Sequence, residues 1–193
     1  MKKMKEFRKI SVIGLGLIAS SICLTLRQKD PTIKLVGYDK DKVVRNRAKK
    51  IGLCKVESNL DNAVSGSQLI ILCVPVGQMQ AVTQRLKKII EPGVTITDVG
   101  SVKLSVIEEI ESNIESVGGK YVPSHPIAGT ERSGPDAGYA GLFAGRWCIL
   151  TPTRKTNKKA LNSLETFWKF LGMHTKIMTP EHHDLVLAVT SHA

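Results

Sequence analysis

Short, nearly uninterrupted apolar segments alternate along the chain with longer stretches whose apolar residues recur at helical spacing. Four segments rich in valine and isoleucine read as strands: Lys9–Ile13, Ile33–Tyr38, Leu69–Val74 and Val94–Thr97. The stretches between them read as helices: Leu17–Lys29, Lys42–Ile51 and Gly77–Ile90. Strands that are apolar on both faces are typical of a parallel sheet covered by helices on both sides. The pattern therefore predicts an α/β domain built from right-handed β-α-β units.

The later part of the chain follows the same pattern less regularly. It predicts a helix over Lys103–Val117, followed by strands over Tyr121–Val122 and Trp147–Leu150. A second helix over Asn157–Leu171 and a third strand over His174–Met178 come next. Residues 124–146 hold five glycines and two prolines without a clear period, so we expect a long functional loop there. Thr179-Pro180-Glu181 then predicts a last helix, with Thr179 as its N-cap.

A glycine-rich turn joins the first predicted strand to the first predicted helix. Gly14 to Ala19 read G-x-G-x-x-A, in which Gly14 permits a tight turn and Gly16 lets a pyrophosphate approach the backbone. The small Ala19 lets the helix pack on the strand, and the backbone N–H groups of Leu17 and Ile18 would face the phosphates. The motif predicts dinucleotide binding, with a purely structural glycine-rich turn as the alternative.

An acidic residue ends the second predicted strand. Asp39 follows Gly14 by 25 residues, where a carboxylate can accept the hydrogen bonds of an adenosine ribose. Its charge would repel a 2′-phosphate and favours NAD over NADP. Lys40, Lys42 and Arg45 follow closely and weaken that preference, so NADP stays possible.

Three further strand ends carry candidate site residues. Val74 and Pro75 end the third strand, where their backbone would border the cofactor, although a simple strand stop is equally consistent. Ser101 follows the fourth strand as a helix cap, a hydrogen-bond donor to substrate, or both. His125 follows a short strand, where it can act as a general base or be a hydrogen-bonded structural residue.

The charge is concentrated at one end of the chain. The formal net charge is +11, and the first 55 residues hold 15 basic and 4 acidic residues, whereas the rest hold 13 of each. No aromatic or basic recognition motif accompanies this excess, so we expect no nucleic-acid partner. With 42% hydrophobic and 23% charged residues, the composition is that of a globular protein and excludes a disordered one.

The cysteines and the N-terminal segment indicate the cellular compartment of the protein. Cys23, Cys54, Cys73 and Cys148 lack zinc-like spacing, and we expect reduced thiols and no metal site. Met1–Lys9 is basic and Ser11–Leu26 is uncharged, which is the outline of a signal peptide, but two glycines and three serines interrupt that run. No apolar run is long enough to span a bilayer. We therefore predict a cytoplasmic protein with no membrane partner.

Five segments spread over almost the whole chain carry a resemblance to one enzyme family. They are Gly14–Ala19, Asp98–Lys103, His125–Gly134, Trp147–Pro152 and Thr190–His192. Together they resemble the prephenate/arogenate (cyclohexadienyl) dehydrogenases of tyrosine biosynthesis, and the histidine segment is the most specific of them. The resemblance implies a Rossmann-type, doubly wound, mainly parallel sheet and an NAD(P)-dependent oxidative decarboxylation of prephenate or arogenate.

The same resemblance implies roles for individual residues. Hydride leaves the ring carbon that bears the 4-hydroxyl group, the ring carboxylate leaves as CO2, and a neutral His125 would accept the hydroxyl proton. Ser101 would orient that hydroxyl group. The segment Gly129, Thr130 and Glu131 would bind substrate, with Glu131 lining the entrance, although a solvated loop carboxylate is the alternative for Glu131.

The end of the chain departs from the family pattern. Members of the family continue from Ser-His into Leu-Pro-His and a helical dimerisation domain with a substrate-binding arginine, whereas this sequence reads Ser191-His192-Ala193. We expect a dinucleotide-binding domain over residues 1–179, with 180–193 starting the helix into a dimerisation domain that is largely missing. The chain would then bind NAD but turn over prephenate poorly, and a homodimer is expected for the full-length members of the family.

Two alternatives stay open. One is another dehydrogenase of a small acid, against which the histidine segment argues, and the other is a catalytically inactive NAD-binding remnant.

The adjacent His182 and His183 lie about 100° apart on a helix and do not form an i,i+4 metal pair.

Overall fold

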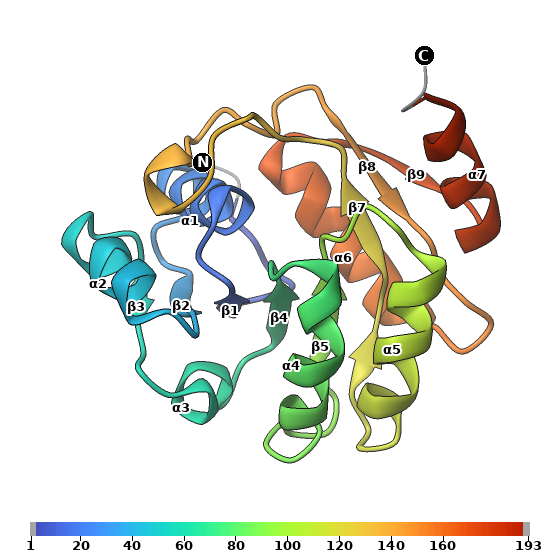
Figure 1. Cartoon of the computed structure of the whole chain (residues 1–193), viewed down its shortest axis with the longest axis horizontal. Helices are drawn as coiled ribbons and strands as arrows, with labels where there is room; N and C mark the ends of the chain where they lie inside the picture. Colours follow the sequence, from blue (N-terminus) through green and yellow to red (C-terminus); the bar gives the residue numbers. More distant parts are fainter. Residues whose placement is uncertain (1–2, 191–193) are drawn as a thin grey trace.

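The computed structural model describes residues 3–190, which form a six-stranded parallel sheet with helices on both faces and a second, three-stranded sheet (Figure 1). The large sheet has the order β3-β2-β1-β4-β5-β6 and every neighbouring pair is parallel. Its strands are β1 Lys9–Ile13, β2 Lys34–Tyr38, β3 Lys55–Val56, β4 Leu69–Leu72, β5 Thr95–Asp98 and β6 Lys120–Tyr121. This strand order confirms the predicted Rossmann-type, doubly wound sheet.

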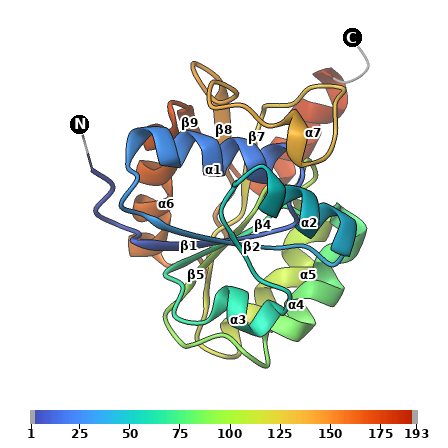
Figure 2. The same ribbon diagram turned by 90° about the vertical axis from the view of Figure 1, so that its left-hand side faces the viewer.

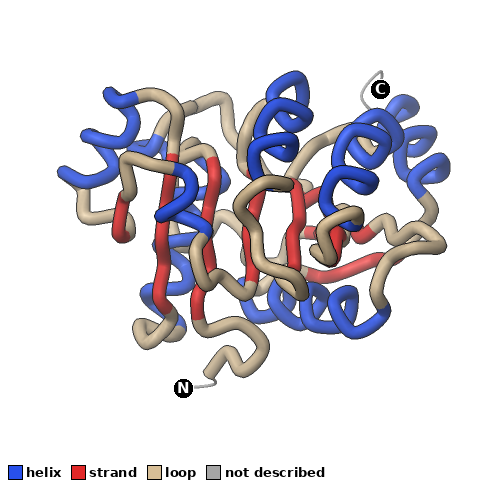
Figure 3. Tube along the Cα trace, turned by 90° about the horizontal axis from the view of Figure 1, so that it is seen from below, coloured by secondary structure: helices blue, strands red, loops and turns tan. Residues whose placement is uncertain are grey.

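The strands of the large sheet are buried on both faces. In β4, Leu69 and Ile71 pack into one core cluster, whereas Ile70 and Leu72 pack into the other. Figure 2 shows α1 and α6 on one side of the sheet and α3, α4 and α5 on the other. The helices are α1 Leu17–Lys29, α2 Lys42–Lys50, α3 Leu60–Val64, α4 Met79–Leu86, α5 Leu104–Glu115, α6 Lys158–Leu171 and α7 Pro180–Thr190. Seen from below, the strands lie between these two layers of helices (Figure 3).

A second sheet adjoins the first. The sequence pattern predicts its last two strands, but not its first strand or their assembly into a separate sheet. It contains β7 Ser124–Pro126, β8 Trp147–Leu150 and β9 His174–Ile177, with β7 antiparallel and β9 parallel to β8. The expectation of a loop from residue 124 onward was therefore wrong for its first three residues. In β7, His125 pairs with Ile149, so the candidate base sits on a strand.

The rest of the predicted loop is anchored on the large sheet's helices. The short 3₁₀ helix η2, Pro135–Ala137, is followed by Gly138, where an added Cβ would lie 2.4 Å from the Cβ of Ser20 in α1. The backbone N–H of Tyr139 donates to the Ser21 hydroxyl at 3.2 Å. The Arg47 guanidinium of α2 donates to both carboxylate oxygens of Asp136. Residues 127–146 thus pass over α1 and α2 along a defined path.

The ends of two helices and two short elements test the predicted element bounds. The backbone N–H of His182 donates to the Thr179 hydroxyl at 3.2 Å, which confirms Thr179 as the cap of α7. The predicted helix from Gly77 to Ile90 is wrong at both ends, because the chain forms a 3₁₀ turn, η1 Val76–Gln78, and α4 ends at Leu86. The sequence pattern also missed β3 and α3.

The N-terminal segment that resembled a signal peptide forms β1 and α1. Its apolar side chains lie in or against one core cluster, except for Ile13, which lies in the other, and this burial explains the uncharged run. Within the described residues, no helix is both long and apolar enough to cross a membrane. The four cysteines, Cys23, Cys54, Cys73 and Cys148, are free thiols.

Candidate active site

The turn at Gly14 takes a conformation that suits only glycine. Its φ is +91°, and an added Cβ would lie 2.6 Å from the carbonyl oxygen of Cys73 and 3.0 Å from Cγ1 of Val74. Its N–H donates to the Tyr38 carbonyl at 2.8 Å. These contacts bring the ends of β1, β2 and β4 together at the carboxyl edge of the sheet, where open α/β sheets bind ligands.

The start of α1 has the features of a phosphate site. Gly16 is the N-cap, no side chain caps the helix, and an added Cβ at Gly16 would meet nothing within 4 Å. Leu17 and Ile18 are half-buried, and Ala19 is fully buried against the core. The first-turn N–H groups and the positive end of the helix dipole are therefore available to an anion. These residues fit a pyrophosphate.

Asp39 is fixed beside this turn by two backbone donors. Its Oδ2 accepts from the Leu15 N–H at 2.8 Å, and its Oδ1 accepts from the Asp41 N–H at 2.9 Å. Each carboxylate oxygen keeps further acceptor capacity. Arg45 donates to the carbonyls of Asp39 and Lys40, at 2.6 and 2.9 Å, and so holds the turn after β2. Asp39 thus fits a ribose-binding carboxylate.

The end of β4 lies next to the glycine turn. The Cys73 N–H donates to the Ile13 carbonyl at 2.7 Å. Cγ1 of Val74 lies 3.0 Å from the position that a Cβ at Gly14 would take. Burial raises the pKa of the Cys73 thiol, so it stays protonated. Val74 is half-buried and Pro75 is exposed. This arrangement agrees with a cofactor border at Val74 and Pro75, and also with a strand stop.

A buried polar network joins the end of β5 to β7. The Lys103 ammonium pairs with Asp98 Oδ2 and donates to the Ser124 carbonyl at 2.9 Å. The Tyr121 hydroxyl donates to Asp98 Oδ1 at 2.8 Å, and the Gly100 N–H donates to Asp98 Oδ2 at 2.8 Å. Burial and the Asp98 charge raise the pKa of Tyr121 well above its usual value, so Tyr121 is a donor. The network fixes the strand of His125 against the loop of Ser101.

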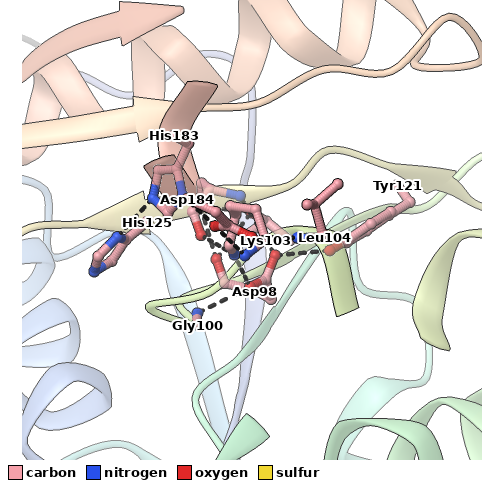
Figure 4. A network of polar contacts seen from close by, with 10 residues as sticks. Asp98, Gly100, Lys103, Leu104, Tyr121, His125, His183 and Asp184 are labelled. Atoms are coloured by element: carbon pink, nitrogen blue, oxygen red, sulfur yellow. Dashed lines mark hydrogen bonds and ion pairs between the residues drawn. The ribbon is translucent and has the colours of Figure 1, made fainter. Parts of the chain in front are cut away.

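His125 is neutral in this environment. Burial, the positive charge of Lys103 and the adjacent His183 lower its pKa to about 4. Its Nδ1 lies 2.9 Å from Nε2 of His183, and the two rings meet edge to face (Figure 4). A neutral imidazole at the carboxyl edge of the sheet can accept a proton from a bound hydroxyl group.

The sequence pattern missed His183 and Asp184. His183 is 1% exposed, and its Nδ1 lies 2.7 Å from Asp184 Oδ1. Helical spacing relates His183 only to its neighbours on α7, whereas its partner His125 is 58 residues away in the chain. The signal available in the sequence was a histidine followed by an acid near a helix start.

The cap of α5 differs from expectation. Asp184 accepts from the backbone N–H groups of Lys103 at 2.8 Å and Leu104 at 3.0 Å. Lys103 is the N-cap residue and provides no side-chain cap, so the helix-cap interpretation of Ser101 was wrong. The substrate-donor interpretation remains, because Ser101 is exposed at the end of β5.

The proposed substrate segment is exposed. Gly129, Thr130 and Glu131 lie on the surface after β7, and the Thr130 hydroxyl accepts from the Arg132 N–H at 3.2 Å. Within residues 3–190, no hydrogen bond or ion pair joins Ser101 or this segment to His125. Ser191, His192 and Ala193, which contributed to the resemblance, lie outside the described residues.

Comparison with known proteins identifies a matching family and several relatives. The model of the family "Prephenate dehydrogenase, nucleotide-binding domain" matches residues 22–177. A cyclohexadienyl dehydrogenase of Zymomonas mobilis is 41% identical over 190 residues, covering 98% of this chain and 64% of that protein. A prephenate dehydrogenase of Bacillus subtilis is 34% identical, covering 100% of this chain and 52% of the relative.

Solved structures show the same architecture. The crystal structure of the Aquifex aeolicus prephenate dehydrogenase in complex with hydroxyphenyl propionate and NAD+ has a TM-score of 0.88 and 30% identity, covering 96% of this chain and 64% of that one. The Synechocystis arogenate dehydrogenase has a TM-score of 0.87 and 29% identity, covering 95% and 64%. This chain thus spans between about half and 64% of the length of these relatives. With a family model matched over most of its length, the chain belongs to the prephenate dehydrogenase family and contains that family's nucleotide-binding domain.

Proposed function

We propose that the protein catalyses the NAD-dependent oxidative decarboxylation of prephenate or arogenate, with His125 as the base. The observation that carries the proposal is a neutral His125, attached through the Asp98 network to the sheet edge that also holds the glycine turn. The NAD+ complex of the similar Aquifex aeolicus enzyme supports the choice of cofactor.

The cofactor would bind between the glycine turn and the end of β4. The N–H groups of Leu17 and Ile18 would donate to the pyrophosphate at the space open beside Gly16. Asp39 would accept from the ribose hydroxyls and disfavour a 2′-phosphate, which makes NAD the preferred cofactor. When bound, the nicotinamide supplies the hydride acceptor.

The protein residues would handle the proton and the orientation of the substrate. As hydride leaves the ring carbon, the hydroxyl proton would pass to His125, and the ring carboxylate would depart as CO2 while the ring becomes an aromatic phenolate. The phenolate oxygen would then take the proton back from His125, which gives the phenol product and restores the neutral base. Ser101 would hold the hydroxyl group, and Glu131 would lie at the entrance to the substrate site. Because aromatisation drives the reaction, alignment is the main task of the protein.

We propose that residues 1–179 make up the dinucleotide-binding domain and that 180–193 begin the helical domain of the family. A cytoplasmic location and a homodimer of the family's full-length members follow from the resemblance, with a small-molecule substrate as the expected partner.

Calorimetric titration and NADH formation test the proposal together. We expect NAD+ to bind more tightly than NADP+, and NADH to form with prephenate or arogenate. His125→Asn should lower turnover by about 10²–10⁴-fold and leave NAD+ affinity within about twofold. His182→Asn, at an exposed neighbouring histidine of α7, is the matched control and should turn over normally. NAD+ binding without substrate binding or turnover would instead favour a catalytically inactive NAD-binding protein.

A further inference from the structure

We propose that His183 is a positioning residue that holds His125 in the tautomer with its proton on Nδ1. The Nε2 of His125 then carries the lone pair that accepts a proton. The use of this lone pair rests on the proposed function, whereas the tautomer is a property of the protein alone.

Two hydrogen bonds link His125 to His183 and His183 to Asp184, and each of them contains one proton. Nδ1 of His125 lies 2.9 Å from Nε2 of His183, and Nδ1 of His183 lies 2.7 Å from Oδ1 of Asp184. Figure 4 shows the contact between His125 and His183, and the second ring nitrogen of His125 points away from His183. Each contact needs one donor and one acceptor.

Asp184 sets the direction of this chain because it is an acceptor only. Burial opposes its ionisation, but hydrogen bonds from the Leu104 N–H, from His183 and from the Lys103 N–H together lower its pKa below the usual value. The ionised carboxylate has no proton to give. Nδ1 of His183 must therefore carry the proton of the contact with Asp184.

The second contact follows from the first. His183 is almost fully buried, and this burial lowers its pKa despite the opposing effect of Asp184, so the ring is neutral near pH 7. A neutral imidazole with its proton on Nδ1 has a lone pair on Nε2. Nδ1 of His125 must therefore donate, and its Nε2 is left unprotonated.

Without His183, the equilibrium between tautomers would change. Free imidazole side chains in water favour the proton on Nε2, which would block the nitrogen that has to accept one. Among the described residues, His183 is the only hydrogen-bond partner of the His125 ring. His183 and Asp184 also lie on α7, so the docking of α7 against α5 determines the protonation pattern of a residue in β7.

The tautomer can be measured directly by two-bond ¹H–¹⁵N correlation NMR of the histidine rings, with the His125 signals assigned by their loss in His125→Asn. In the unmodified chain at neutral pH, we expect His125 to be protonated on Nδ1 and unprotonated on Nε2. Protonation on Nε2 instead would overturn the inference, and the measurement needs only the assignment variant His125→Asn to fold.

Variants at position 183 test the cause. His183→Phe keeps a ring but has no acceptor, so the His125 proton should move mainly to Nε2. His183→Gln places an amide oxygen near the former Nε2, and it should restore the Nδ1 tautomer. His182→Phe is the matched control and should leave the His125 signals unchanged. An Nδ1 tautomer in folded His183→Phe would refute the role of His183.

Kinetics separate this inference from the proposed function. In an active protein, His183→Phe should lower kcat by about tenfold or more, while the Kd for NAD+ stays within about twofold, and His183→Gln should recover part of kcat. A protein that shows the Nδ1 tautomer but forms no NADH would overturn the proposed function and leave the tautomer assignment standing.

Discussion

The Lys103 ammonium and the Asp98 carboxylate form an ion pair in which neither side chain has exposed surface. Asp98 ends β5, and Lys103 begins the turn into α5 and also donates to the carbonyl of Ser124 in β7. The pair therefore joins the two segments that carry Ser101 and His125. Such a pair is costly to break, because the remaining charge has no water to solvate it.

Lys103→Met should destabilise the fold strongly, since it leaves the Asp98 carboxylate buried without its cation. We expect a loss of about 3–5 kcal/mol in the free energy of unfolding, measured by urea denaturation. Lys155→Met removes the cation of the more exposed Lys155–Glu111 pair and should cost less than about 1 kcal/mol. Equal losses in the two variants would contradict the structural role of the buried pair.

Alanine substitutions should show that Gly14 is needed mainly for stability and Gly16 mainly for NAD+ binding. At Gly14 the positive φ and the 2.6 Å approach to the Cys73 carbonyl should make alanine cost about 2 kcal/mol or more of stability. At Gly16 the space is open, so alanine should keep the fold within about 0.5 kcal/mol and weaken NAD+ binding about tenfold. Thermal unfolding and calorimetry measure both effects, with Gly141→Ala as the control at an ordinary contact. Unchanged NAD+ affinity in Gly16→Ala would place the pyrophosphate elsewhere.

The large sheet could be predicted from the sequence because its strands are apolar on both faces and its helices are long and periodic. In the second sheet, β8 and β9 were predicted, but β7 was not. It consists of Ser124, His125 and Pro126 and becomes a strand only through its pairing with β8. Likewise, β3 has two residues and α3 has five, which are too short for a reliable periodic signal.

The candidate site was predictable where it follows a local motif. The glycine turn and Asp39 lie at fixed spacing within one β-α-β unit, so the sequence alone places them together. The contacts of His183 with His125, and of Asp184 with α5, join residues 58 and about 80 positions apart. No local pattern encodes such tertiary contacts. The sequence therefore offers Ser101 as one candidate for the cap that Asp184 provides.

The pKa of His125 predicts a loss of stability at acidic pH. Burial, Lys103 and His183 lower this pKa to about 4, against the opposing effects of Asp98 and Asp184. Between pH 6.5 and 4 the unfolded chain binds the proton and the folded chain does not, so stability falls as the pH drops through this window. The contribution is about 3 kcal/mol from a shift of this size.

Urea denaturation at several pH values checks this expectation. His125→Gln should lose less stability than the unmodified chain between pH 6.5 and 4, because glutamine takes up no proton there. His182→Gln, at an exposed histidine, should follow the unmodified chain. If His125→Gln shows the full acid-induced loss, another group is responsible for it.

The basic residues after Asp39 should differ in their effect on NAD+ binding. Lys40 and Lys42 are exposed and free to attract the anionic dinucleotide, whereas Arg45 donates to the carbonyls of Asp39 and Lys40. Lys40→Gln/Lys42→Gln should weaken binding about threefold at low ionic strength and reduce its salt dependence. Arg45→Gln should instead disturb the turn that positions Asp39, and weaken binding at every salt concentration. Lys158→Gln/Lys159→Gln, at the start of α6, is the control for the change in net charge. If the NAD+ affinity of Lys40→Gln/Lys42→Gln depends on salt as strongly as that of the unmodified chain, Lys40 and Lys42 are only solvated surface residues.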